Sequence, residues 1–224
     1  MDNRYQEGKL LLINKPLAWT SFDVVKKLRY TLKVKKIGHA GTLDPLATGL
    51  LIIGTGRFTK KLNDLQGLDK EYEGIIEIGK TTPSYDLETE FDSESAWDHL
   101  KAEDFERVKD ELSGDILQVP PAHSAVKVDG ERAYKKARKQ KEVKLEPRSV
   151  AIKAFEIDTS NLPEIAFRVE CTKGTYIRSL AHDFGQKLGV GGYLKKLVRT
   201  KVGEYQLSDA EELDEFVRKH AEGH

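Results

Sequence analysis

The sequence contains a single cysteine, Cys171, among 224 residues, which excludes an internal disulfide framework. It also lacks long apolar runs: none approaches the roughly 18 residues that a membrane-spanning helix needs. The N-terminal segment MDNRYQEGK leads only into a short apolar stretch, which is unlike a signal peptide. These scarcities predict a soluble protein of a reducing compartment, with cytoplasmic localisation and no membrane contact. Cys171 itself is expected to be a buried small residue.

Motifs for nucleotide cofactors and metals are missing as well. Gly54 and Gly56 follow a strand-like run, but Thr59 stands where a dinucleotide-binding fingerprint needs its third glycine. There is no P-loop GK[ST], and the histidines are scattered without an HExxH pattern. The sequence therefore predicts neither a cofactor nor a metal.

The formal net charge is zero, yet the charges are segregated along the chain. Residues 24–37 carry six Lys/Arg and no acid, and residues 127–148 carry nine Lys/Arg against four acids. Residues 84–115 instead carry twelve Asp/Glu against three Lys/Arg. Each run alone is typical of a solvated helix face, but several basic runs together favour a surface that binds nucleic acid.

Apolar periodicity predicts a mixed α/β protein, and a length of 224 residues suggests one large domain or two small ones. A helix beginning with Ser21 as its cap should carry a basic face, and Gly189 is expected to end an amphipathic helix over 175–188. A capping box at 208–211 predicts a last helix. The expected apolar stripe of the first helix is Phe22, Val25, Leu28 and Leu32. The expected strands are 9–14, 50–54, 70–79, 116–119, 150–157 and 164–171, with further helices at 57–65 and 102–112.

The most informative stretch is GHAGTLDPLATGLL, residues 38–51. Gly38, Gly41 and the Asp44-Pro45 step predict a turn, and the apolar run that follows predicts a buried strand. Asp44 would then be presented from a loop on a rigid scaffold, which suits a reactive group. Taken alone, Asp-Pro is also common turn chemistry.

This stretch resembles the motif around the catalytic aspartate of the TruB family of tRNA pseudouridine synthases, bacterial enzymes that isomerise uridine 55 in the T loop. Four further segments resemble the family in the same order along the chain, from residue 8 to about 207. They are GKLLLINKPLAWTS, KEYEGIIEIG, QVPPAHSAVKVDGERAY and CTKGTYIRSLAHDFG.

The resemblance implies the pseudouridine synthase fold: a mixed, mostly antiparallel sheet flanked by helices, classed as α/β (α+β). The catalytic domain would span residues 1–207 and include a basic, RNA-binding thumb at about 122–149. Residues 208–224 would add a C-terminal helix without the PUA domain that relatives commonly carry. Where this chain has Tyr85-Asp86-Leu87-Glu88, relatives favour a Thr-x-Asp pattern followed by glycine.

The resemblance also implies the site. Asp44 would be the catalytic carboxylate, with Arg178 as its ion-pair partner and Tyr72 stacked on the target uracil. An arginine in the first turn of a helix opposes the helix macrodipole, which independently suggests a role beyond the fold. Whether Asp44 attacks the sugar carbon C1′ or acts through another intermediate stays open.

Four further residues match positions that contact RNA or line the pocket: His39, Tyr176, Leu197 and Lys15. His39 would fill the space that the flipped-out base leaves, since an imidazole can stack on RNA bases. Without the resemblance, Tyr72, Tyr176 and Leu197 would be interpreted as core residues. Lys15 is expected to be structural near the pocket.

The expected partner is the T stem-loop of tRNA, bound by a monomer that needs no protein partner. One alternative is a tRNA chaperone or binding module in which catalysis is secondary. Another is the related guide-RNA-dependent enzyme of archaea and eukaryotes, which the expected lack of a PUA domain disfavours.

Overall fold

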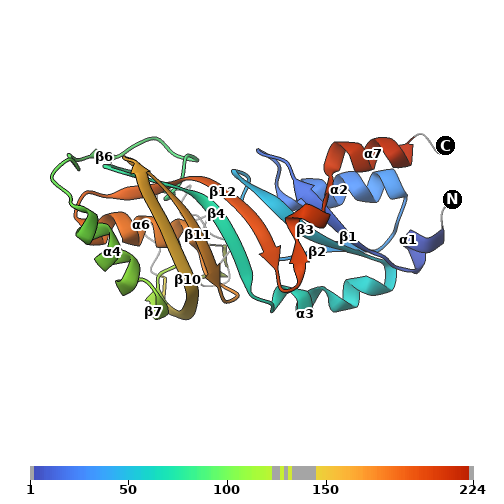
Figure 1. The fold of residues 1–224 in the computed structure, drawn as a ribbon. Helices are drawn as coiled ribbons and strands as arrows, with labels where there is room; N and C mark the ends of the chain where they lie inside the picture. The colour runs from blue at the N-terminus through green and yellow to red at the C-terminus, as the bar shows by residue number, and fades with distance from the viewer. Residues whose placement is uncertain (1–2, 123–126, 129–130, 133–144, 222–224) are drawn as a thin grey trace. The chain divides into compact units, whose positions relative to one another are not determined.

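The computed structural model describes residues 3–122, 127–128, 131–132 and 145–221 (Figure 1). The chain divides into two compact units, residues 1–72 with 197–224 and residues 73–196. It crosses from one unit to the other within strands β4 (Lys70–Ile78) and β12 (Gly192–Val202). The fold is mixed α/β with a mostly antiparallel sheet flanked by helices, which confirms the predicted class. No helix of the described ranges combines the length and the apolarity needed to span a lipid bilayer.

The first unit is built on β3 (Ala47–Thr55), which pairs antiparallel with β1 (Leu10–Lys15) and parallel with β12. β2 (Ile37–Ala40) also pairs with β3, and two short strands complete the sheet: β13 (Tyr205–Gln206) on β12 and β14 (Glu211–Glu212) on β1. The helices are α1 (Asn3–Glu7), α2 (Ser21–Leu32), η1 (Gly56–Lys61), α3 (Leu62–Gln66), η2 (Leu207–Asp209) and α7 (Leu213–Ala221).

Strand β3 is buried on both faces. Leu51 and Ile53 belong to one apolar cluster with residues of α2 and α7, which lie side by side in Figure 1. Leu50 and Ile52 belong to a second cluster with Leu62 of α3. All four side chains are fully buried, so the continuous apolar run fixes β3 as the centre of a three-layer packing.

The second unit has the strand order β12, β4, β11 (Glu164–Cys171), β10 (Arg148–Asn161), β7 (Gly114–Gln118). Helices α4 (Ala102–Glu111) and α6 (Ile177–Leu188) lie side by side (Figure 1), and α6 packs Phe184 against Phe155 of β10 with ring centroids 6.0 Å apart. Two small ladders are added: β5 (Lys80–Thr81) with β6 (Ser93–Glu94), and β8 (Lys127–Val128) with β9 (Glu131–Arg132). Most of the expected thumb at 122–149 lies outside the described residues.

Two local predictions for α2 are wrong. The N-cap is Thr20, whose hydroxyl accepts from the Asp23 backbone in a reciprocal capping box, and Ser21 is already helical. Phe22 is 64 % exposed, whereas Val24, Val25 and Leu28 are buried. Val25 and Leu28 of the predicted stripe are confirmed and Leu32 packs against the same cluster, so only Phe22 is wrong, and Val24 is buried in addition.

Some other helices and strands differ from those that the sequence predicted. Residues 208–211 do not open the last helix, since η2 and β14 come before α7. The predicted helix 57–65 is a 3-10 turn followed by the five-residue α3. The eleven-residue strand β12 was not predicted, although it lies in both units. Gly189 does end α6, in the left-handed conformation, and Cys171 is buried, both as expected.

A close approach between α6 and the start of β12 leads to a first prediction. A Cβ atom at Gly185 would lie 2.1 Å from the backbone nitrogen of Gly192. Backbone cannot move away as a flexible side chain would, so Gly185→Ala should lower the free energy of unfolding by about 2 kcal/mol. Urea denaturation measures the loss, and Gln186→Ala on the exposed side of α6 is the control, expected within about 0.5 kcal/mol of the parent. Equal stability of the two variants would contradict the packing.

Candidate active site

Asp44 lies in the turn between β2 and β3, where the sequence placed it. The backbone of this turn is fixed at several points. The Ser21 hydroxyl bonds both the nitrogen (2.9 Å) and the oxygen (3.2 Å) of Leu43, and the Ala18 nitrogen donates to the Pro45 oxygen at 2.9 Å. The Asp44 oxygen itself accepts from the Ala47 nitrogen at 3.1 Å. These backbone bonds hold the Asp44 turn in position.

Lys15 is the central residue beneath this turn. Its side chain is fully buried, and its ammonium donates to the backbone oxygens of Pro16 (2.9 Å), Trp19 (2.5 Å) and Pro45 (3.3 Å). Burial lowers the pKa of Lys15 to about 8, the charge of Asp44 raises it, and Arg199 lowers it again. Lys15 therefore joins the end of β1, the entry to α2 and the Asp44 turn through one buried cation.

Arg199 is a second buried cation of this unit, and its role was missed in the sequence. It is 1 % exposed, and it donates from Nε to the Leu50 oxygen (2.8 Å) and from Nη2 to the Gly41 oxygen (3.1 Å). Gly41 has a φ of +78°, so the turn needs a residue that tolerates the left-handed region. The guanidinium therefore bonds the turn before Asp44, at the Gly41 oxygen, and the Lys15 ammonium bonds it after Asp44, at the Pro45 oxygen.

His39 lies on β2, half-buried and opposite Ile53 of β3. Burial lowers its pKa first, the charge of Arg199 lowers it further, and the backbone of Gly41 acts weakly in the opposite direction. The imidazole is therefore neutral at physiological pH. Neutral imidazole is the form that stacks on a base without placing another cation beside Lys15 and Arg199.

Leu197 and Tyr72 are both 8 % exposed. Leu197 pairs in register with Ala47, three residues after Asp44, and its oxygen accepts from the Thr48 hydroxyl at 3.5 Å. Tyr72 lies on β4, next to β12 in the strand order. The first unit thus holds five of the seven predicted residues: Lys15, His39, Asp44, Tyr72 and Leu197.

Arg178 and Tyr176 belong to the second unit, at the start of α6. Tyr176 is the N-cap, and its backbone is held in both directions by the Gln118 side chain, at 2.7 and 3.0 Å. Arg178 is 4 % exposed and lies in the first helical turn, as predicted. The Ser179 hydroxyl donates to the Val119 oxygen at 2.7 Å, so the end of β7 fixes the helix start that carries the arginine.

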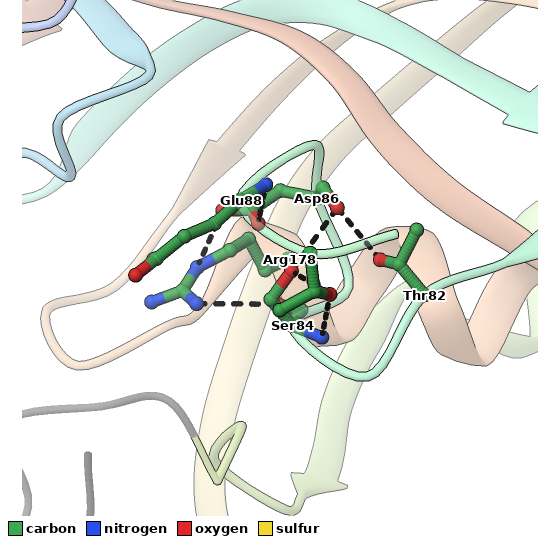
Figure 2. A network of polar contacts seen from close by, with 6 residues as sticks. Thr82, Ser84, Asp86, Glu88 and Arg178 are labelled. Atoms are coloured by element: carbon green, nitrogen blue, oxygen red, sulfur yellow. Dashed lines mark hydrogen bonds and ion pairs between the residues drawn. The ribbon is translucent and has the colours of Figure 1, made fainter. Parts of the chain in front are cut away.

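The arginine contacts a loop whose importance the sequence did not reveal (Figure 2). Nε of Arg178 lies 3.6 Å from a carboxylate oxygen of Asp86, and Nη1 donates to the Ser84 oxygen at 3.2 Å. The hydroxyls of Thr82 and Ser84 both donate to the Asp86 backbone oxygen, at 2.6 and 3.1 Å. Asp86 is 5 % exposed, so this is a buried ion pair beside a loop that the Thr82 and Ser84 hydroxyls brace.

An aromatic stack holds the same loop against α6. The ring centroids of Tyr85 and His182 are 3.8 Å apart and the rings are 13° from parallel. The backbone oxygen of Tyr85 also accepts from the Leu194 backbone nitrogen at 2.9 Å. Tyr85 has a φ of +65°, a conformation that a tyrosine rarely adopts. The segment that departs from the family pattern is therefore tied to the turn of α6 that follows Arg178.

Models of two families match the chain. A TruB family pseudouridylate synthase N-terminal domain matches residues 29–177, and a tRNA pseudouridylate synthase B C-terminal domain matches residues 178–223. The first model alone covers more than half of the chain. With its mixed sheet and its Asp44 turn, the chain belongs to the TruB family of pseudouridylate synthases.

Curated relatives narrow the assignment. A protein of Flavobacterium johnsoniae named tRNA pseudouridine synthase B is 51 % identical over 95 % of this chain and 96 % of its own length. One of Bacteroides fragilis with the same name is 51 % identical over 91 % of this chain and 90 % of its own. The chain is accordingly a TruB-family tRNA pseudouridine synthase.

Solved structures resemble the chain over 96 % of its length. The crystal structure of a Cbf5-Nop10-Gar1 complex matches with a TM-score of 0.72 and 28 % identity, and an archaeal box H/ACA sRNP Nop10-Cbf5 complex with 0.71 and 25 %. This chain spans 54 % of each of those chains. The resemblance supports the pseudouridine synthase fold.

The buried lysine leads to a pH-dependent prediction. The pKa of Lys15 is lowered from 10.5 to about 8 in the folded protein, so between these values the unfolded chain holds a proton that the folded protein has released. The contribution of Lys15 to stability therefore rises with pH in this window and is constant below it. Urea unfolding at pH 7 to about 10 should show this rise in the parent and not in Lys15→Met. A parent-minus-variant difference that falls with pH would contradict it.

The Arg178–Asp86 pair leads to a third prediction. Asp86→Asn keeps an acceptor for the Glu88 nitrogen but leaves the buried guanidinium without this carboxylate, and should cost about 3 kcal/mol. Chemical denaturation measures the loss. The control is Glu156→Gln, which removes an exposed partner of Arg168 and should cost at most about 1 kcal/mol. Losses of similar size in both variants would show that burial adds nothing to the Asp86 pair.

Proposed function

We propose that this chain converts uridine 55 in the T loop of tRNA to pseudouridine, with Asp44 as the catalytic carboxylate. The observation that supports this choice is the fixed turn: the backbone on both sides of Asp44 is bonded to Ser21, Lys15 and Arg199. Catalysis needs reactive groups held close to their productive position, and this turn satisfies that need before substrate arrives.

The reaction breaks the C1′–N1 glycosidic bond, turns the detached uracil and forms a bond between C1′ and C5. C5 then loses its proton and N1 gains one, so the atoms balance without oxidation or hydrolysis. The Asp44 carboxylate acts on the electron-poor sugar, either as a nucleophile or by stabilising an oxocarbenium-like centre. We assign Tyr72 to stacking on the uracil and assistance in removing the C5 proton.

The target base must leave the T loop to reach Asp44, at a cost of a few kcal/mol of lost stacking. We assign His39 to the space that the base vacates, since its pKa is lowered and a neutral ring stacks without a charge. Tyr176 and Leu197 would line the uracil pocket, with Lys15 supporting its floor. The enzyme would act in the cytoplasm as a monomer on tRNA.

We further propose that Arg178 faces Asp44 when tRNA is bound. A guanidinium carries five N–H donors in a planar fork, which allows it to hold two carboxylates at once. The support is that Arg178 already lies against Asp86 in a buried network that fixes its position. Asp86 would then be a positioning residue for the arginine.

The test is Asp44→Asn, which keeps the size of the side chain and removes its charge. We expect normal folding, tRNA affinity within about threefold of the parent, and a loss of pseudouridine formation of at least about 1,000-fold. Pseudouridine mapping of an unmodified tRNA transcript, without added cofactor or metal, measures the product and its position. Asp64→Asn, on the exposed face of α3, is the control.

Appreciable activity in Asp44→Asn would refute the role of the aspartate, and modification at another position would refute the assignment to uridine 55. The alternative function, a tRNA chaperone, predicts that Asp44→Asn and the parent restore misfolded tRNA equally. Chaperone activity with no product from the parent protein would favour that alternative.

A further inference from the structure

Helix α2 borders an open groove of about 840 Å³ within the first unit. Its lining combines aromatic and apolar side chains with four cations. The ring of Tyr30 is 85 % exposed, and Trp19 is half-buried against the core. The cations are Lys26, Lys27, Arg29 and Lys33.

Among the residues that line this groove, four cations face a single acid. None of the four cations forms an ion pair with an acidic group of the residues that the structure describes. The one acid in the lining, Asp23, accepts from the backbone and the hydroxyl of Thr20 in the capping box. Lys26, Lys27 and Arg29 are exposed on α2 and Lys33 is its C-cap, so four cations lie near one another and repel, and a polyanion would relieve that repulsion.

The groove shares a wall with the Asp44 turn. Ala18 and Trp19 line the groove, and the Ala18 nitrogen donates to the Pro45 oxygen. Lys15 holds the oxygens of both Trp19 and Pro45. All of these residues belong to the first unit. The segment that supports the Asp44 turn therefore also lines the groove.

We propose that this groove is a second contact surface for the RNA substrate, separate from the nucleotide that enters the site. Lys26 and Lys33 would neutralise backbone phosphates, and the exposed ring of Tyr30 would stack on an unpaired base beside Trp19. Cations interleaved with aromatic rings are the arrangement by which proteins hold single-stranded RNA without reading its sequence. The inference deepens the proposed function, since the RNA in the groove is the molecule that presents uridine to Asp44.

The charge test compares Lys26→Gln/Lys33→Gln with Lys60→Gln/Lys61→Gln. The second pair lies on η1 of the same unit and removes equal charge outside the groove. For an unmodified tRNA transcript, we expect the groove variant to bind roughly tenfold more weakly. The slope of log Kd against log salt should also become shallower by about 1.5 to 2, because two phosphate contacts are lost. The kcat at saturating tRNA should be unchanged.

The aromatic test compares Tyr30→Ser with Phe22→Ser. Both side chains are exposed on α2, but only Tyr30 lines the groove. The proposal requires a loss of affinity from Tyr30→Ser alone. A direct readout uses Trp97→Phe, which leaves Trp19 as the only tryptophan. Its emission should then change when RNA binds, and this change should require higher RNA concentrations after Lys26→Gln/Lys33→Gln.

Equal losses in groove and control variants, or unchanged affinity in both, would overturn the proposal and leave the groove to a protein partner. Failure of the proposed function is distinguishable. If the parent protein makes no pseudouridine while the groove variants still lose tRNA affinity selectively, the surface stands without the catalytic assignment. If the parent modifies tRNA and the groove variants bind it normally, the catalytic assignment stands and the groove proposal fails.

Discussion

The buried ammonium of Lys15 is the contact on which the first unit's functional features depend. Removing a cation from water is costly, and here the cost is offset by three backbone oxygens and by the charge of Asp44. Those three oxygens belong to two segments that lie far apart along the chain, the entry to α2 and the turn after β2. Because one cation satisfies both, neither segment can shift without leaving carbonyl groups unsatisfied. The positions of Asp44 and of the groove wall are thereby linked.

The second unit uses a related arrangement around Arg178. A buried cation again lies next to a braced loop, in which the hydroxyls of Thr82 and Ser84 donate to the Asp86 backbone oxygen and Arg178 donates to the Ser84 oxygen. In both units the charge is fixed by the fold before any substrate binds. Fixed charges need no reorganisation during reaction, which is why preorganised sites stabilise developing charge better than water does. Tyr85, strained and stacked on His182, shows that the chain tolerates local backbone cost to keep this loop in place.

The sequence predicted those parts of the structure in which local signals and packing agree. The run Leu50–Ile53 became a strand buried on both faces, and α6 ended at Gly189. β12 was missed because lysines and arginines interrupt its apolar residues without a regular alternation, and one of these cations, Arg199, is buried. Asp86 was missed because its partner lies far along the chain, and no local pattern reports such a pair. The cap of α2 was misplaced by one residue because Thr20 and Ser21 are both good caps; in the structure Thr20 forms the capping box with Asp23, and the Ser21 hydroxyl is bonded to Leu43 instead.

The first unit has exposed cations on α2 and buried cations, Lys15 and Arg199, and the two groups should affect the reaction differently. The α2 cations lie in water, where salt screens them, and they act on tRNA equally before and during the reaction. Such uniform binding energy lowers KM and leaves kcat unchanged. Lys15 and Arg199 are buried, salt screens them little, and they act on the position of Asp44. Sensitivity to salt should therefore belong to tRNA binding and sensitivity to alkaline pH to the Asp44 turn, even though residues 16–19 take part in both.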